Sequence, residues 1–196
     1  MIECQLRDGT AVVVRPLGVA DRDAVAEGYR RLSPESRYQR FWVRGGGVIG
    51  EAMLDRLLTV EAGKHAVWGV MDLARDFPGV GAASFWRSAD DDEEAEFSCT
   101  VLDADQRKGV GTLLLAVLWL AALKVGVRRF VGYTMPENVS AIRWMRDTEA
   151  EGEWDGYKVT FRWELEDFEK LPATAAAVEL AERLAEFSEL VMGGDA

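Results

Sequence analysis

The clearest chemical pattern in the sequence lies between Glu96 and Thr112. Residues 106–111 read QRKGVG, and the two glycines fall where a strand-like run gives way to a helical one. Glycine lets the backbone approach a ligand closely, and the first N–H groups of a helix have no partners within it. The helix dipole and the side chains of Arg107 and Lys108 add positive charge. The pattern predicts a site for a phosphate-like anion, although a plain strand-to-helix turn would give the same loose pattern.

Two better-known phosphate motifs are absent from this stretch. The glycines do not have the G-x-G-x-x-G spacing of dinucleotide-binding folds, and no Gly-Lys-Ser/Thr ending of a P-loop is present. The sequence therefore disfavours a Rossmann enzyme or a nucleoside triphosphatase.

Helical and strand-like runs interleave around this stretch, with consecutive strands in the middle of the chain. This order predicts a mixed sheet in an α/β or α+β layout. The predicted strands are 10–15, 65–71, 80–87, 96–102, 129–134 and 157–165, and the predicted helices are 21–31, 33–42, 51–60, 112–127, 138–146 and 173–192. The acidic run at residues 90–94 is expected to be a solvated hairpin tip.

The length of 196 residues predicts one main domain. The only plausible boundary lies near Leu171 and Pro172, which divides the chain into residues 1–171 and a helical extension, 172–196. That extension carries an apolar stripe, which predicts burial against its own domain or against a second copy in a homodimer. The stripe consists of Leu180, Leu184, Phe187 and Val191.

The composition excludes several classes of protein. The net charge of −11 repels nucleic acid and anionic membranes and favours cationic partners. Two cysteines and one histidine are too few for a disulfide framework or a zinc site, so no metal is expected. The longest apolar run, 113–123, is too short to span a bilayer, and no secretory signal begins the sequence. These features predict a cytoplasmic protein.

The loop Gln106–Gly111 resembles the R/Q-x-x-G-x-G/A signature of the GNAT acyl-CoA N-acyltransferases. Asn138 followed by Ala141 is similar to the N-x-x-A of that family, and the order of the elements agrees over residues 10–165. The resemblance implies an α+β fold with a central, mostly antiparallel twisted sheet. It implies that acetyl-CoA binds as co-substrate through residues of one strand, the glycine loop and the next helix start. These residues are Cys99, Thr100, Val101, Arg107, Lys108, Gly109, Val110, Gly111, Thr112 and Asn138.

A narrower resemblance concerns the acceptor side. Residues 15–17 (RPL) and 31–41 (RLSPESRYQRF) look like the acetyltransferase domain of bacterial protein lysine acetyltransferases. In those domains an A-E-F segment supplies a glutamate general base, and Ala95-Glu96-Phe97 stands in that position. An alkyl amine must lose a proton before it attacks a thioester, which a carboxylate can accept. The resemblance implies transfer to a primary amine, either a small molecule or a lysine of a protein.

Several alternatives stay open. Many GNAT proteins carry a tyrosine as general acid in the helix after the Asn, but residues 142–145 read IRWM, so Tyr133 or no residue would serve. This departure keeps a non-catalytic acyl-CoA sensor as a second interpretation. Arg37, Arg40 and Arg44 form a cationic stripe; most such stripes are solvated, and a minority contact a phosphate or an acidic substrate. His65 and Cys99 are expected to be structural.

Overall fold

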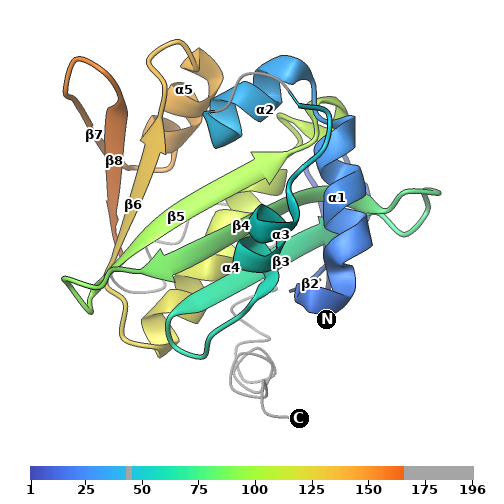
Figure 1. The fold of residues 1–196 in the computed structure, drawn as a ribbon, viewed down its shortest axis with the longest axis horizontal. Coiled ribbons are helices and arrows are strands. Elements are labelled where there is room, and N and C mark those ends of the chain that lie inside the picture. Colours follow the sequence, from blue (N-terminus) through green and yellow to red (C-terminus); the bar gives the residue numbers. More distant parts are fainter. Residues whose placement is uncertain (43–45, 166–196) are drawn as a thin grey trace.

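The computed structural model describes residues 1–42 and 46–165. Eight strands form one sheet in the order β1-β2-β3-β4-β5-β6-β8-β7, and only the β5–β6 pair is parallel (Figure 1). The strands are β1 (Ile2–Gln5), β2 (Ala11–Pro16), β3 (His65–Met71), β4 (Gly79–Arg87), β5 (Glu94–Val101), β6 (Arg129–Thr134), β7 (Glu151–Trp154) and β8 (Val159–Glu164). The sequence-based prediction of a mixed, mostly antiparallel sheet is confirmed.

Five α-helices cover the sheet. They are α1 (Arg22–Arg31), α2 (Pro34–Phe41), α3 (Glu51–Leu58), α4 (Val110–Lys124) and α5 (Val139–Asp147). Ser33 caps α2 by accepting a hydrogen bond from the Ser36 amide, and Pro34 occupies the first turn, as the sequence predicts. We call α1, α2 and α3 the cap; Figure 1 shows α1 and α3 on one face of β3 and β4, with α4 on the other.

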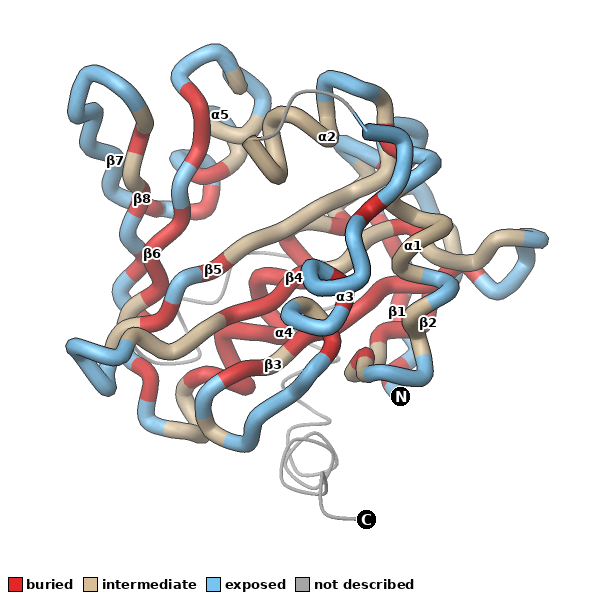
Figure 2. The backbone as a smooth tube through the Cα atoms, in the orientation of Figure 1, coloured by how far each residue is buried: buried red, intermediate tan, exposed pale blue. Residues whose placement is uncertain are grey.

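The main core lies between α4 and the sheet. Twelve residues of α4 are buried, which explains why this helix is apolar all round (Figure 2). Close packing there depends on Gly81 of β4, because a Cβ atom at that position would lie 2.9 Å from Val110 Cγ1. The sheet therefore sets the start of α4, which carries the glycine loop.

Strands β5 and β6 part after a short common stretch. They pair only from Glu94–Arg129 to Glu96–Val131, whereas β6 pairs with β8 over its whole length. Beyond Glu96, no strand of the described chain pairs with that edge of β5. The two ribbons diverge from there in Figure 1, and we call the region between β5 after Glu96 and β6 after Val131 the wedge.

Two edge strands, β1 and β7, lie outside the predicted elements. Strand β7 is exposed throughout, so its sequence has no apolar alternation to reveal it. The predicted C-terminal helix and its stripe lie outside the described residues. Within the described ranges, no helix is long and apolar enough to cross a membrane.

Candidate active site

Glu96 lies where β5 and β6 separate. It forms the last residue pair of the parallel ladder, with Val131, and its side chain is exposed. Side chains alternate along a strand, so Glu96 shares a face with Ser98 and Thr100. Both hydroxyl side chains hydrogen-bond to Arg40 of α2, which shows that this face of β5 points toward the cap. The wedge therefore has a carboxylate at its base, on the cap side.

The opposite face of β5 is packed with aromatic side chains. Phe97 lies 5.4 Å from Phe130 and 5.6 Å from Trp163, measured between ring centroids. Trp144 of α5 joins this cluster at 6.4 Å from both Phe97 and Trp163. The cluster fixes the positions of β5, β6, β8 and α5 relative to one another, and so it fixes the wedge.

The two carboxylates at the start of β5 have different surroundings. Glu94 pairs with Arg129 at 3.3 Å, and Arg129 also contacts Asp91 and Glu164. Glu96 forms no ion pair within the part of the chain that the structure describes. Of these two carboxylates, Glu94 is thus held by an arginine and Glu96 is the more exposed one.

Tyr133 of β6 lies on the same face of the sheet as Val131 and Glu96 and is 40% exposed. Burial raises the pKa of Tyr133, and the negative charges of Glu96 and Glu94 raise it further. Lys158 Nζ sits 3.9 Å from the centroid of its ring. The phenol is therefore protonated at neutral pH and can donate a proton.

Two residues of the glycine loop have the positive φ angles of the left-handed region, which glycine adopts more readily than other residues. Gly109 is the N-cap of α4 with φ +94°, and Arg107 also has a positive φ, +65°. A Cβ atom at Gly109 would lie 3.5 Å from Arg7 Cγ, and the Arg7 amide donates to the Lys108 carbonyl. The β1–β2 turn thus supports the loop from outside, and Arg7 adds a positive charge beside it.

Buried ion pairs fix the segment before the loop. Asp105, at 1% exposure, accepts two hydrogen bonds of 2.8 Å from Arg75 and one of 2.9 Å from Lys108. The Arg75 guanidinium holds the pKa of Asp105 below its usual range, and Lys108 lowers it further. The ammonium group of Lys108 is thus committed to Asp105, whereas Arg107 stays exposed.

Other predicted cofactor residues act partly as structural supports. Thr112 accepts a hydrogen bond of 3.1 Å from Trp144 Nε1, and a Cβ atom at Gly111 would lie 3.5 Å from the same indole. Val110 is buried in the core. Asn138 caps α5 by accepting from the Ala141 amide at 3.1 Å. The side chains of Val110, Thr112 and Asn138 are thus engaged within the protein, so a ligand at the start of α4 would meet backbone groups there.

The side chains of Cys99 and Val101 pack against the core. Their backbone groups lie on the edge of β5 that has no partner strand beyond Glu96 in the described chain. Burial raises the pKa of Cys99 to about 12. A thiol with that pKa is a poor nucleophile at neutral pH, which argues against an acyl-cysteine intermediate.

Some residues near the site could not be found from the sequence pattern. The contact of Arg7 with Gly109 joins positions that are 102 residues apart, and Trp144 looks like any core aromatic. Of the cationic stripe, Arg37 lies over the Tyr29 ring, Arg40 turns toward β5, and Arg44 lies outside the described residues. His65 stacks on Trp86 at 3.8 Å and contacts the Thr59 carbonyl at 2.9 Å, which is a structural arrangement.

Two bacterial acetyltransferases are each 31% identical to this chain over the aligned residues. Acetyltransferase PA5475 of Pseudomonas aeruginosa is 31% identical over 145 residues, which cover 72% of this chain and 74% of the relative. Acetyltransferase Pat of Mycolicibacterium smegmatis is 31% identical over 139 residues, 71% of this chain and 41% of the relative. The chain thus spans less than half of the length of the second protein. No protein-family model matches.

Solved structures show the same fold. The GNAT domain of S. lividans PAT superposes with a TM-score of 0.76 at 23% identity, covering 83% of this chain and 95% of that one. A cAMP-binding acyltransferase from Mycobacterium smegmatis superposes with a TM-score of 0.67 at 24% identity, covering 98% of this chain and 54% of that one. The structure of yncA from Salmonella typhimurium, solved with its cofactor acetyl-CoA, gives 0.60 at 20% identity, over 80% and 95% of the two chains. The chain belongs to the GNAT superfamily of N-acetyltransferases, and within it resembles the acetyltransferase domains of bacterial Pat proteins.

Proposed function

We propose that this protein is an acetyl-CoA-dependent N-acetyltransferase that acts on a primary amine by direct attack on the thioester. The observation that carries the proposal is the wedge between β5 and β6, which has unpaired Glu96 at its base and the start of α4 beside it. The family of the chain and the acetyl-CoA bound in the yncA structure support the choice of donor.

The co-substrate is held by backbone groups. The amides of residues 107–112 bind the pyrophosphate of CoA at the positive end of α4, and Arg7 adds charge beside them. The open edge of β5 at 99–101 pairs with the pantetheine arm, and its N–H groups polarise the thioester carbonyl. Asn138 lies at the start of α5, on the far side of the wedge.

The amine nitrogen forms a bond to the carbonyl carbon while the carbon–sulfur bond breaks. Glu96 accepts the proton that the ammonium form must lose, directly or through water. The CoA sulfur leaves as a thiolate, which either departs unassisted or takes a proton from Tyr133. The second proton, which the nitrogen loses as the amide forms, passes to solvent or restores Tyr133. The products are an N-acyl amine and CoA, so the reaction needs no further reactant.

A lysine side chain of a protein is one candidate acceptor. The likeness to Pat domains and the net charge of −11, which attracts basic proteins, support it. A homodimer formed through residues 172–196 and a cytoplasmic location are further parts of the proposal. The second candidate function is an acyl-CoA sensor without turnover, favoured by the lack of a tyrosine at residues 142–145, in the helix where many GNAT proteins carry one.

The decisive test is Glu96→Gln, assayed by release of CoA thiol over a panel of amines. Turnover should fall roughly 10²–10⁴-fold, while CoA affinity stays near that of the wild type. The loss should shrink as the pH approaches the pKa of the amine, since more acceptor is then already deprotonated. Glu94→Gln is the matched control. Because Glu94 is held by Arg129, this substitution should reduce turnover only slightly. Full activity of Glu96→Gln would refute the base, and tight CoA binding without release for any amine would favour the sensor.

A separate pair of variants tests the cofactor site. Gly109→Glu puts a carboxylate beside the pyrophosphate and should abolish CoA binding in calorimetry. Gly109→Ala introduces only the strain of a side chain at φ +94°, about 1–2 kcal/mol, and should weaken binding much less. Equal effects of the two substitutions would mean that the loop geometry, and not the phosphate, explains the loss.

A further inference from the structure

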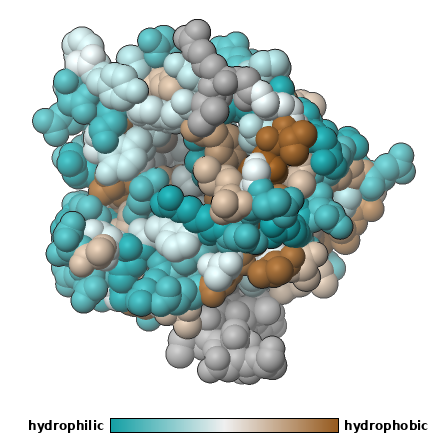
Figure 3. All heavy atoms as spheres, in the orientation of Figure 1, coloured by the Kyte–Doolittle hydropathy of each residue, from teal (hydrophilic) through white to brown (hydrophobic). Residues whose placement is uncertain are grey.

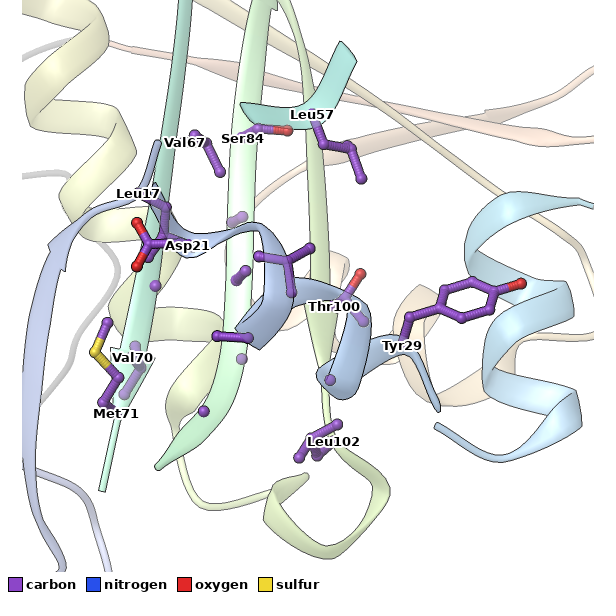
Figure 4. Close-up of a pocket in the computed structure, with 18 of the residues that line it drawn as sticks. Leu17, Asp21, Tyr29, Leu57, Val67, Val70, Met71, Ser84, Thr100 and Leu102 are labelled. Atoms are coloured by element: carbon purple, nitrogen blue, oxygen red, sulfur yellow. The ribbon is translucent and has the colours of Figure 1, made fainter. Parts of the chain in front are cut away.

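A cavity of about 300 Å³ lies between the cap and the sheet. Apolar side chains of α1, α3, β3 and the segment after β2 line most of it, among them Leu17, Leu57, Val67 and Met71 (Figure 4). Its volume is at the lower end of the range for small-molecule sites, roughly 300–1,000 Å³. In the space-filling view, hydrophobic atoms gather over α1 and α3 on an otherwise hydrophilic surface (Figure 3).

The polar groups of the cavity converge at β5. Arg40 Nε donates to Thr100 Oγ1 at 3.0 Å, and Arg40 Nη2 donates to Ser98 Oγ at 2.7 Å. Ser98 Oγ lies 3.1 Å from Ser84 Oγ of the neighbouring strand. Figure 4 shows Ser84 and Thr100 on adjacent strands, with Tyr29 of α1 pointing toward α2. The cavity is thus apolar along α1 and α3 and polar where it meets the strand of Glu96.

Arg40 has no charged hydrogen-bond partner in the part of the chain that the structure describes, although the negative charge of nearby Glu96 acts on it. Its partners in the described chain are two neutral hydroxyls and the ring of Phe41, whose centroid lies 4.9 Å from the guanidinium carbon. The other charged pair in the cavity, Arg15 with Asp21, is satisfied internally. Burial lowers the pKa of Arg40, yet a guanidinium remains charged at neutral pH.

A half-buried cation whose hydrogen-bond partners are all neutral is costly, and a ligand carboxylate would offset that cost. Guanidinium presents five N–H donors in a fork that matches a carboxylate. The two hydroxyl bonds leave the other three donors for such a group. Because Ser98 and Thr100 follow Glu96 on one face of β5, a molecule bound to Arg40 can direct a second group toward Glu96.

We propose that this cavity is the acceptor pocket and that it takes a small amine carrying a carboxylate and an apolar body, the chemistry of a hydrophobic amino acid. The carboxylate binds Arg40, the apolar body lies under the cap, and the amine faces Glu96 and the thioester. The inference rests on the proposed function, and it narrows the acceptor from any primary amine to this class.

The experiment compares matched acceptors with acetyl-CoA as donor: leucine, methionine and phenylalanine against their amides and against glycine. We expect the hydrophobic amino acids to have the highest kcat/KM. Arg40→Gln should lower their kcat/KM roughly 10–100-fold, the usual effect of a charge-assisted hydrogen-bonded pair, and leave the amides within about threefold. Arg37→Gln is the matched control, because Arg37 lies one turn away over Tyr29 and should change neither class. Melting temperatures of both variants, with Arg40→Lys alongside, check that the fold is intact.

Three outcomes would overturn the proposal. Arg40→Gln could lower kcat/KM equally for the amino acids and their amides, or the wild type could show no preference for the amino acids over their amides. The third is faster acetylation of a lysine peptide that does not depend on Arg40. A preference for a succinyl over an acetyl donor that is lost in Arg40→Gln would assign the carboxylate to the acyl group and would also overturn it. Calorimetry of leucine into the protein saturated with CoA gives a readout without turnover. Binding that depends on Arg40 in the absence of any turnover would uphold the pocket and refute the proposed function.

Discussion

The eight residues of β5 alternate between two faces of the sheet, and the two faces have different roles. One face, with Ala95 and Phe97, packs against aromatic rings and α4, and these two side chains are buried. The other face, with Glu96, Ser98 and Thr100, meets a half-buried arginine and a cavity. The comparison shows how one strand can pack into the core with one face while the other face carries the polar side chains of the proposed active site.

The largest expected effect on stability comes from the packed face. Phe97→Ala removes a ring at 3% exposure that contacts Phe130, Trp144 and Trp163, so the free energy of unfolding should fall by about 3–5 kcal/mol. Urea denaturation measures it. The matched change on the other face is Thr100→Val, which keeps the volume and removes one acceptor of Arg40, at a cost of about 1.5–3 kcal/mol, the usual value for a hydrogen bond to a charged group. Similar costs for the two variants would contradict the division of the strand into a packed face and a chemical face.

A smaller effect is expected from the ion pairs beneath the glycine loop. Arg75→Ala leaves the buried Asp105 with Lys108 as its only charged partner, and we expect a loss of about 1–3 kcal/mol together with weaker CoA binding. An unchanged CoA affinity would mean that this network serves stability alone.

The same network predicts a dependence on pH. The pKa of Asp105 is lower in the folded than in the unfolded chain, so its stabilising contribution is complete above the ordinary carboxyl pKa and is lost as the pH falls through the folded value. Between about pH 5 and pH 3, wild-type stability should therefore drop more steeply than that of Asp105→Asn. Parallel curves would show that other carboxylates control acid unfolding.

The alternation that separates the two faces could be predicted from the sequence, but what each face meets could not. The strand and the glycine loop follow from local patterns, because β-rich runs and glycines before an apolar helix act over a few residues. Arg40 reaches Ser98 across 58 residues and Arg7 reaches Gly109 across 102, contacts that depend on how the sheet places distant segments together. Likewise, the sequence suggests that the ammonium group of Lys108 could bind an anionic ligand, whereas the fold shows that it donates a hydrogen bond to Asp105.

The smallest expected effect concerns Cys99, which belongs to the packed face. With its pKa raised to about 12, only about 10⁻⁴ of the thiol is ionised at pH 8, so iodoacetamide should leave it unmodified for hours in the native protein. Mass spectrometry of the native and the urea-unfolded chain measures the difference. Fast alkylation in the native state would place Cys99 at the accessible surface of the wedge.

The cap has a consequence for how this protein could change in evolution. All three of its helices come from one continuous stretch of chain between β2 and β3, residues 17–64, whereas the glycine loop, the aromatic cluster and Glu96 all lie after it. Substitutions or insertions in that stretch reshape the cavity without moving the residues proposed to bind the coenzyme. Acceptor preference can therefore diverge among descendants of one ancestral gene while the use of the donor is inherited unchanged.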